Sequence, residues 1–459
     1  MKNLKLLLPL LLLAVFAPGC NKDENKSSSE NLVSSYPNDV AWEWNDVFLR
    51  IERYAAGYRP GPAPTALGYM GFAAYEACAP GFSEYKSIAS YFPEISLPRF
   101  ENGKEYHWPT VVNAVYNYMM PRFFADQTVE HKSWMSQLFA RLNTQYRQEV
   151  SQEVFDRSIK RGTDVAEAVY SWFTTDPVAF QHYRNPFQGY DWATAYKKEG
   201  DWRPTPPGPD QPMGGVYGGC RTFVLRGSAE KTCRRPLPYS TEKNSPYYGQ
   251  AWEVYTRNNP LEADEDQWVG EFWSDDLLGQ TFSPGPRWLA IGNQVLKLEN
   301  SNLEIALVMN AKVGIALHES AVGAWYSKYA YNVERPVTYI NKYIDPDWKT
   351  SLYWAEPDWE GFSPPFPAYP SGHSTMGAAG AEALSSIFGY RYAMTDKCHE
   401  GRREFNGNPR SFNSFFEMAQ ENAWSRVPLG VHWRMDCDEG VRFGTWIGTL
   451  VNTRLPWKG

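Results

Sequence analysis

Apolar residues recur every three or four positions through most of the chain, which is the period of an amphipathic α-helix. In the first half this spacing predicts helices over residues 40–54, 66–78, 111–120, 129–146 and 149–173, with Pro121 expected to end the third. In the second half it predicts helices over residues 247–257, 265–272, 287–330, 374–388, 411–425 and 440–455. Almost no stretch alternates apolar and polar residues as a strand does. We therefore expect an all-α fold.

Helical spacing fails between the two halves of the chain. Residues 191–245 are rich in proline and glycine and include the run TPPGPDQPMGGVYGG. A run of this composition forms either a flexible linker or an ordered crossover, and its aromatic residues favour order. The sequence thus predicts two helical bundles, residues 37–190 and 246–459, joined by this Pro/Gly-rich segment.

The first residues have the features of a targeting segment. Lys2 and Lys5 precede an apolar run that is too short for a stable spanning helix, and small residues lead directly to Cys20. This pattern resembles the lipobox of bacterial lipoproteins, which implies a signal peptide over residues 1–20 and a lipid on Cys20. Residues 21–36 are polar and serine-rich, as expected of a flexible tether. We expect an exported protein, lipid-anchored to the bacterial outer membrane or cell surface; the alternative is a secreted protein with a coincidental cysteine.

Composition narrows the possible partners. The net charge of −7 gives no basic footprint for nucleic acid. No later apolar stretch has the length expected of a spanning helix, so the only expected membrane contact is the lipid anchor. No Cys/His cluster has zinc spacing. Apart from Cys20 five cysteines remain, of which Cys220 and Cys233 flank a short glycine-containing segment and are the expected disulfide. The sequence does not determine the oligomeric state.

The first segment with chemical potential is KYAYNVERP, residues 328–336. Lys328 and Arg335 are seven residues apart, so on one helix they would lie on the same face with Trp325. Two fixed cations and an indole on one stripe can surround an anion. Taken alone, the segment is better explained as a solvated face near a helix C-terminus, where cations are favoured.

The second segment is PPFPAYPSGHST, residues 364–375. Gly372 lets the backbone approach a ligand closely, and the free N–H groups of a helix that begins here favour an anion. Ser371 adds a hydroxyl donor, and His373 adds a side chain that exchanges protons near neutral pH. An ordinary helix N-cap with a surface histidine explains the same residues equally well.

The third segment is SRVPLGVHWRMD, residues 425–436. If His432 and Asp436 share a helix, the carboxylate is close enough to orient the imidazole. A histidine that bonds to a metal or phosphorus centre needs one nitrogen free and the other N–H held by an acceptor. The alternative is an ion pair that stabilises the helix, formed by Arg434, His432 and Asp436.

Together the three segments outweigh these separate explanations. In order they read K-x6-RP, PSGH and SR-x5-H-x3-D, which resembles the complete signature of the type 2 phosphatidic acid phosphatase and vanadium haloperoxidase superfamily. The eleven signature residues are Lys328, Arg335, Pro336, Pro370, Ser371, Gly372, His373, Ser425, Arg426, His432 and Asp436. The signature covers the predicted C-terminal bundle, whereas the N-terminal half carries no comparable motif.

The resemblance implies a role for each of these residues. Lys328, Arg335, Ser371, the Gly372 amide and Arg426 would bind the equatorial oxygens of vanadate, and His432 would be its metal ligand. His373 would act as acid and base, Lys328 would also polarise the bound peroxide, and Asp436 could hold the other ring nitrogen of His432; these four are the expected catalytic residues. Several cationic donors are what a multiply charged oxyanion requires, and guanidinium forks suit tetrahedral oxygens. The same donors stabilise a trigonal-bipyramidal centre, so one site supports haloperoxidase and phosphatase chemistry.

The surrounding sequence favours the haloperoxidase branch. Three features are similar to that branch: Trp325, the segment EFWSDD and the segment WRPTPP at 202–207. Within EFWSDD, the resemblance implies that Asp276 faces Arg426. The resemblance implies oxidation of halide by hydrogen peroxide to hypohalous acid, with vanadate as a Lewis acid. One alternative is an exported acid phosphatase that uses His432 as nucleophile, although those enzymes are typically shorter. A second alternative is an inactive oxyanion-binding lipoprotein.

Phe366 bears on the choice of halide. Bromoperoxidase-like members of the family tend to have histidine at this position, whereas chloroperoxidase-like and bacterial iodide-specific members have phenylalanine. Tyr326 and the aromatic surroundings add no further cation to activate peroxide. Since chloride is the hardest halide to oxidise, we expect iodide to be preferred, bromide to react weakly and chloride hardly at all.

Overall fold

A computed structural model describes residues 31–182, 184–258, 264–276, 278–352, 360–403 and 406–458. The predicted signal peptide, Cys20 and most of the predicted tether lie outside these residues. In the first half the helices are η2 (Val33–Ser35), α1 (Asp39–Glu52), α2 (Pro62–Cys78), η3 (Ala79–Gly81), η4 (Ala89–Tyr91), α3 (Trp108–Phe123), α4 (Val129–Tyr146), α5 (Gln152–Thr174), α6 (Pro177–His182), α7 (Trp192–Ala195), η5 (Tyr217–Gly219) and α8 (Gly227–Lys231). In the second half the elements are α9 (Pro246–Arg257), α10 (Asp264–Phe272), α11 (Pro286–Leu298), α12 (Leu303–Tyr331), α13 (Pro336–Tyr343), α14 (Gly372–Phe388), β1 (Met394–Asp396), β2 (Arg410–Phe412), α15 (Phe415–Ser425) and α16 (Arg434–Arg454).

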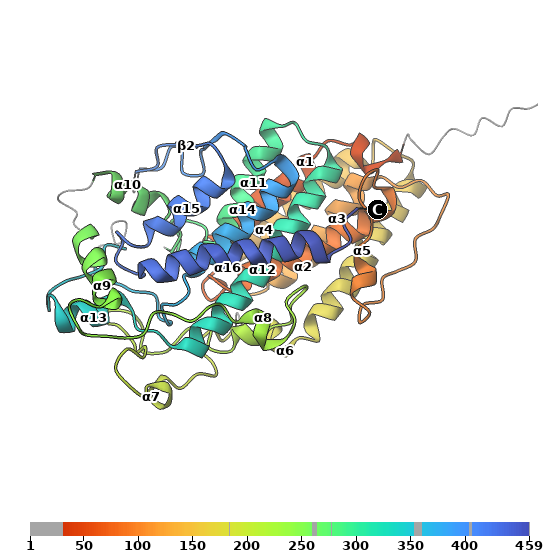
Figure 1. Ribbon diagram of the computed structural model, residues 1–459. Helices are drawn as coiled ribbons and strands as arrows, with labels where there is room; N and C mark the ends of the chain where they lie inside the picture. The colour runs from red at the N-terminus through yellow and green to blue at the C-terminus, as the bar shows by residue number, and fades with distance from the viewer. Residues whose placement is uncertain are drawn as a thin grey trace, which may run out of the picture.

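The all-α fold is confirmed, and its two halves share one large hydrophobic core. α12 packs against α2 from the first half and against α14 and α16 from the second, and it runs through the middle of the molecule (Figure 1). α3 and α5 lie at one end, and α9, α10 and α13 lie at the other. The largest core cluster includes side chains from α1, α2, α3, α5, α12 and α14. The Pro/Gly-rich segment is ordered, as its aromatic content predicted, and η5 and α8 within it contact α12.

α12 corrects the expectation that no later segment has the length of a spanning helix. Its 29 residues are long and apolar enough to cross a membrane by length and composition alone, yet 94% of its most apolar window is buried inside the protein. A helix that is apolar all round is buried either in lipid or in a large protein core. Here the surrounding helices take the place of lipid.

The predicted helix over residues 287–330 is in fact two helices. α11 ends at Leu298, and Asn300 adopts a left-handed conformation with φ 45°. Asn302 then caps α12, because its side chain accepts a hydrogen bond from the Ile305 amide at 3.0 Å. The apolar period continues across the break because both helices bury much of their surface, and so periodicity alone did not reveal it.

Three other boundaries differ from the sequence expectation. Residues 410–412 form strand β2, which pairs antiparallel with β1, so α15 begins only at Phe415. Pro121 lies inside α3, near its end, and does not stop the helix. The predicted tether is shorter than expected, because Val33 is fully buried and the Tyr36 carbonyl accepts from the Leu303 amide at 2.9 Å.

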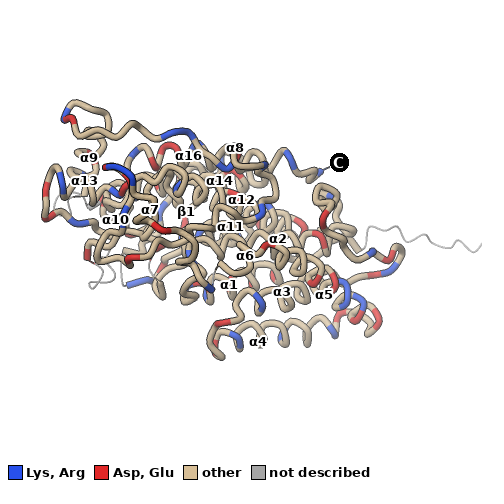
Figure 2. Tube along the Cα trace, turned by 90° about the horizontal axis from the view of Figure 1, so that it is seen from below, with Lys and Arg blue, Asp and Glu red and all other residues tan. Residues whose placement is uncertain are grey.

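The helices at the edge of the molecule are amphipathic. α4 lies along one side and carries both acidic and basic positions (Figure 2). It buries only Met135, Leu138, Leu142 and Tyr146, at the spacing of a single stripe.

The expected disulfide is absent. Cys220 and Cys233 are both buried and both free, and the other cysteines of the described residues are also free. The short glycine-containing segment between them includes α8, which folds separately against α12. Proximity in sequence was therefore a poor guide to sulfur pairing.

Candidate oxyanion site

The structure brings the three signature segments together at the ends of helices. Lys328 lies in the last turn of α12, Arg335 is the N-cap of α13, and Ser371 is the N-cap of α14. The seven-residue spacing suggested that Lys328 and Arg335 share one helix face. In the structure they lie on different helices, so this expectation is wrong. α12 ends at Asn332, whose φ of 52° turns the chain so that Arg335 points back toward Lys328.

The linker between α12 and α13 is held by the Pro/Gly-rich segment. The Trp202 amide donates to the Asn332 carbonyl at 2.7 Å, and Asp201 forms an isolated β-bridge with Val333. The Glu334 amide donates to the Gly200 carbonyl at 2.9 Å. This segment thus fixes the backbone from which Arg335 extends, a role that the sequence comparison of WRPTPP did not suggest.

Arg335 is fully buried and its guanidinium is held in one orientation. Its Nε donates to the Phe366 carbonyl at 3.0 Å, and Nη1 donates to the Val431 carbonyl at 2.7 Å. Nη1 also lies 3.2 Å from Nε2 of His432. These contacts join the first signature segment to the second and the third.

The second segment forms the start of α14. Ser371 Oγ accepts a hydrogen bond from the Ser374 amide at 3.3 Å, and the Ser371 amide donates to the Asp436 carbonyl at 3.0 Å. His373 is only 6% exposed, which excludes the surface histidine considered above. A Cβ on Gly372 would lie 3.1 Å from the Trp325 ring, a tight contact, so glycine eases the close approach of α14 to α12.

His432 and Asp436 meet without sharing a helix. α16 begins at Arg434, with Trp433 as its N-cap, so His432 precedes the helix and Asp436 lies in its first turn. Asp436 Oδ2 accepts from the Trp433 amide at 3.1 Å and lies 2.8 Å from His432 Nδ1. The predicted contact is therefore present, but the capping geometry of α16 produces it. It leaves Nε2 facing Arg335.

Glycines on α16 bring the second and third segments together. A Cβ on Gly440 would lie 2.6 Å from Ser374 Cβ, and a Cβ on Gly444 would lie 2.0 Å from the Thr375 carbonyl oxygen. Both distances are too short for any side chain. Because these positions carry no Cβ, α16 packs directly on the first turns of α14.

Arg426 and His373 share an acidic neighbour. Arg426 Nη2 donates to Asp276 Oδ2 at 2.6 Å, and His373 Nε2 lies 3.6 Å from the same oxygen. Asp276 therefore faces Arg426, as the resemblance implied, and it also contacts the proposed acid/base histidine. The His373 carbonyl accepts a hydrogen bond from the Asn422 side chain at 3.1 Å, a partner that no motif indicated.

Aromatic rings line one side of the site. Phe366 lies 5.1 Å from Trp325 between ring centroids. Lys328 Nζ lies 5.2 Å from the centroid of the Phe366 ring, and the guanidinium carbon of Arg335 lies 5.0 Å from the same centroid. Lys328 Nζ also donates to the carbonyls of Pro367 and Ala368 at 3.0 and 2.9 Å, which leaves one of its three N–H groups for a ligand.

The buried charges of the site shift one another's pKa values. Burial, followed by repulsion from Arg335, lowers the pKa of Lys328 far below its ordinary value. Burial also lowers the pKa of Arg335 to about 9, and burial together with Arg426 lowers that of His373 to about 3. Burial raises the pKa of Asp436 to about 7. An anion placed among these groups would favour their charged forms.

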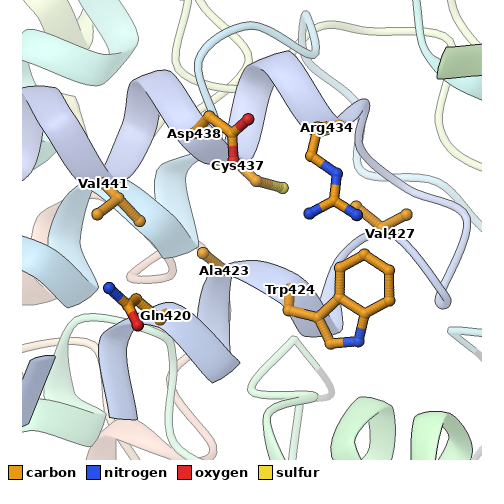
Figure 3. A pocket seen from close by; sticks show the side chains of 8 residues that line it. All are labelled: Gln420, Ala423, Trp424, Val427, Arg434, Cys437, Asp438 and Val441. Carbon is orange, nitrogen blue, oxygen red and sulfur yellow. The ribbon is translucent and has the colours of Figure 1, made fainter. Parts of the chain in front are cut away.

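Arg434 does not take part in the site. Its guanidinium pairs with Glu253 and lies 4.4 Å from the Trp424 ring, so it is not part of the ion pair considered for His432 and Asp436. It lines a groove of about 350 Å³ between α15 and α16, together with Trp424, Cys437 and Asp438 (Figure 3).

The donors of the site fit an oxyanion such as vanadate. Arg335 Nη2, Arg426 Nε and His373 Nε2 are buried and have no hydrogen-bond partner among the described residues. Buried polar groups are almost always hydrogen-bonded, so unpartnered donors at one place indicate a ligand. They come from three separate chain segments and surround His432, whose Nδ1 is already held by Asp436. The residues present therefore suit a tetrahedral or trigonal-bipyramidal anion.

A second buried charge network supports the site from behind. Arg287 pairs with Asp396 at 2.7 Å and with Asp275 at 3.4 Å, and its Nη1 lies 2.5 Å from His399 Nε2. Asp275 precedes Asp276, so this network holds the loop that carries the partner of Arg426. In the sequence, the only indication of this charge network was the pair of aspartates in EFWSDD.

His318 has a structural role outside the site. His318 Nδ1 lies 3.0 Å from Thr65 Oγ1, and Nε2 lies 2.7 Å from the Arg221 carbonyl oxygen. Glu319 accepts hydrogen bonds from the amides of Phe223, Val224 and Leu225. Among the described residues, no group of three or more His, Cys, Asp or Glu side chains is arranged to hold a metal ion.

The sequence and the fold of the chain are similar to those of known vanadium-dependent proteins. The family model of the VCPO second helical-bundle domain matches residues 308–456. Vanadium chloroperoxidase of Curvularia inaequalis is 30% identical over a segment covering 30% of this chain, and the chain spans 29% of that relative's length. The solved structure of the first bacterial vanadium-dependent iodoperoxidase has a TM-score of 0.78 and 25% identity, covering 92% of this chain and 98% of that one. A holo-type bacterial vanadium-dependent chloroperoxidase has a TM-score of 0.62 at 16% identity, covering 86% and 92%, and shows the fold alone.

The fold is a helical bundle, and it contains a buried cluster of cationic and histidine side chains that suits an oxyanion. Residues 308–456 match the VCPO second helical-bundle domain, and the fold of the chain is similar to that of a bacterial vanadium-dependent iodoperoxidase.

Proposed function

We propose that the protein is a vanadate-dependent haloperoxidase that oxidises halide with hydrogen peroxide to hypohalous acid. The observation that carries the proposal is the set of buried, unpartnered donors on Arg335, Arg426 and His373 around His432. Vanadate, when bound, supplies a Lewis-acidic centre that activates peroxide while the oxidation state of vanadium stays the same.

The residues of the chain would bind the anion, ligate its central atom and transfer protons. Lys328, Arg335 and Arg426 would hold the oxygens of the anion, together with the Ser371 hydroxyl and the Gly372 amide. His432 would present Nε2 to the central atom, because Asp436 holds its Nδ1. Burial and Arg426 lower the pKa of His373, whereas a bound anion would raise it toward neutral pH, where the imidazole can accept a proton from peroxide and return it to the leaving oxygen.

We further propose that iodide is the preferred halide. Phe366 and Trp325 place aromatic carbon beside Lys328, which suits a large and weakly hydrated anion. The solved structure that aligns over 92% of the chain is that of an iodoperoxidase. Iodide also demands the least activation of peroxide, and we expect bromide to react weakly and chloride hardly at all.

The test is steady-state kinetics of vanadate-reconstituted protein with peroxide and each halide, compared by kcat/KM, beside hydrolysis of a phosphate ester. Vanadate binding is measured separately by equilibrium dialysis. A kcat/KM for chloride equal to that for iodide would contradict the halide preference alone. Phosphatase activity without peroxidase activity would identify an acid phosphatase with His432 as nucleophile, and vanadate binding without either activity would identify an inactive oxyanion-binding protein.

A further inference from the structure

A cleft of about 450 Å³ lies between α1 and α4 in the N-terminal half of the chain. The two helices pack beside each other at one edge of the molecule (Figure 2). All the residues that line the cleft belong to these two helices, whereas the residues of the oxyanion site lie in the second half of the chain. The volume of the cleft is within the range of roughly 300–1,000 Å³ that is typical of small-molecule sites.

Two half-buried tryptophans line the cleft, Trp42 on α1 and Trp134 on α4. Lys297 Nζ lies 3.7 Å from the centroid of the Trp42 ring, but Lys297 does not line the cleft. The ring face that the lysine covers is therefore not the face that borders the cleft, which stays available to a ligand. An indole face is a rigid apolar surface on which a flat molecule packs well.

Two charged side chains in the cleft have unused bonding capacity. Asp46 and Arg50 are four residues apart on α1, a spacing at which opposite charges often pair. Neither forms a hydrogen bond or an ion pair with any of the residues that the structure describes. The guanidinium carbon of Arg50 instead lies 4.4 Å from the centroid of the Trp134 ring. Stacking of this kind fixes the guanidinium and leaves the N–H groups along its edge for a ligand.

The charges that line the cleft balance one another. Glu43 on α1 pairs with Arg141 on α4, and Asp46 and Arg50 carry one charge of each sign. The cleft therefore has no net attraction for a charged molecule. Together with the amide of Gln137, its polar groups supply both donors and acceptors. A matching ligand is uncharged and rich in hydroxyls, because each hydroxyl both donates and accepts.

We propose that the cleft between α1 and α4 binds a neutral oligosaccharide, with one pyranose ring stacked on Trp42 and its hydroxyls bonded to Asp46, Arg50 and Gln137. A pyranose has C–H groups on its faces and hydroxyls around its edge, which matches an indole beside unpaired polar groups. Neighbouring hydroxyls suit a planar carboxylate and a planar guanidinium, because each of these groups can bond to both oxygens of the pair. The inference does not rest on the proposed function, since none of these residues belongs to the oxyanion site.

The experiment is saturation-transfer NMR of the protein with maltose, cellobiose and lactose, each titrated separately. We expect at least one of these sugars to bind with a Kd on the order of 1 mM, as an open cleft with one free stacking face allows. Transfer should be strongest to the C–H protons on one face of one pyranose ring, because that face packs on the indole. Digalacturonate, which has similar rings but carries carboxylates, should bind no more tightly, because the charges of the cleft are balanced.

Variants of the cleft separate stacking from hydrogen bonding. Trp42→Ala is expected to weaken sugar binding at least about tenfold, and Trp42→Phe, which keeps an aromatic face, should recover most of the affinity. Asp46→Ala, at an exposed position with little risk to folding, should weaken binding about fivefold. Trp252→Ala is the matched control, because Trp252 is 49% exposed on α9 and does not line the cleft. All four variants should bind vanadate as the wild type does.

The outcomes decide this inference independently of the proposed function. Absence of saturation transfer to all three sugars at about 20 mM overturns it, as does sugar binding that Trp42→Ala and Asp46→Ala both leave unchanged. Tighter binding of digalacturonate than of every neutral sugar also overturns it, because the cleft would then select an anion. Sugar binding that is weakened in either cleft variant and unchanged in Trp252→Ala supports the site, whatever the halide kinetics show.

Discussion

At the residue scale, His432 shows how the fold prepares one nitrogen for a ligand. Asp436 takes Nδ1 at 2.8 Å, and the carboxylate itself is fixed by the Trp433 amide at 3.1 Å. The imidazole is 2% exposed and burial, together with Arg335, lowers its pKa, so it stays neutral. A neutral imidazole with one nitrogen held is the form that bonds to a metal centre.

His432→Ala is therefore expected to weaken vanadate binding by at least about 100-fold, because it removes the proposed ligand atom. His373→Ala is the comparison, since it removes the proposed acid/base group but leaves Lys328, Arg335 and Arg426 in place. It should keep vanadate affinity within about tenfold and lose most of its turnover. Equilibrium dialysis measures affinity, and equal affinity in wild type and His432→Ala would contradict the assignment of the ligand.

His318, outside the site, provides a test of pH-dependent stability. Burial lowers its pKa to about 4, against an ordinary value near 6.5. Between these values the unfolded chain binds a proton that the folded chain does not, so stability falls as pH falls. From pH 6.5 to 5, wild type should lose about 2 kcal/mol from this group.

The comparison is with His318→Gln, which cannot take up the proton. Its free energy of unfolding should fall less over the same pH range, so the difference between the two proteins narrows. Urea unfolding at each pH gives both curves. Parallel curves would show that the pKa of His318 is the same in the folded and unfolded states.

At the scale of elements, the contact between α14 and α16 decides whether the signature segments meet. Ser371, Gly372 and His373 begin one helix, and His432 and Asp436 stand at the start of the other. Gly440 and Gly444 allow the two helices to pack at backbone distance. Helix packing thus contributes to the anion site as directly as the motif residues do.

Gly444→Ala is expected to destabilise the protein by about 1–3 kcal/mol, because the new methyl group would overlap the Thr375 carbonyl. It should also weaken vanadate binding by moving α16 away from α14. The control is Gly249→Ala in α9, where a Cβ meets no atom within 4 Å. That change should stabilise by about 0.5–1 kcal/mol through helix propensity, without affecting vanadate. Similar stability for both variants in thermal unfolding would argue against tight packing at Gly444.

At the scale of the whole molecule, the two halves form one structure around α12. Glu319 on this helix accepts three amides from residues 223–225 of the Pro/Gly-rich segment, and residues 200–202 of that segment hold the linker to Arg335. The N-terminal half contributes α2, which packs along α12. The halves therefore support the site together, although the motifs lie in one of them.

The position of the protein in the cell stays a prediction. If Cys20 carries a lipid, Cys20→Ser should release the exported protein from membranes without changing its stability or its vanadate affinity. Membrane fractionation and mass spectrometry of the N-terminus make the measurement. Wild-type protein that is already unacylated and free of membranes after export would contradict the anchor.

The sequence alone determined the helical class and most helix positions, because apolar spacing follows directly from helix geometry. Through the resemblance of three segments to a family signature it also predicted the residues of the candidate anion site, and those residues carry the cations, hydroxyl, amide and histidines that an oxyanion would need. It did not reveal the break between α11 and α12 or the strand at 410–412, where local caps and pairing override the period. It also gave the wrong reason for the geometry, since it placed Lys328 and Arg335 on one helix.

Only the tertiary structure decided how the site is assembled. Asn332 turns the chain between Lys328 and Arg335, Trp202 holds that turn, and Gly444 allows α16 to reach α14. Each of these acts through contacts between residues that are distant in sequence, so no local pattern records them. A cavity of about 460 Å³ that Asp276 and Phe366 line has the same origin, because its walls come from several separate segments. Local spacing specifies elements and chemical groups, whereas the positions of those groups depend on packing across the whole chain.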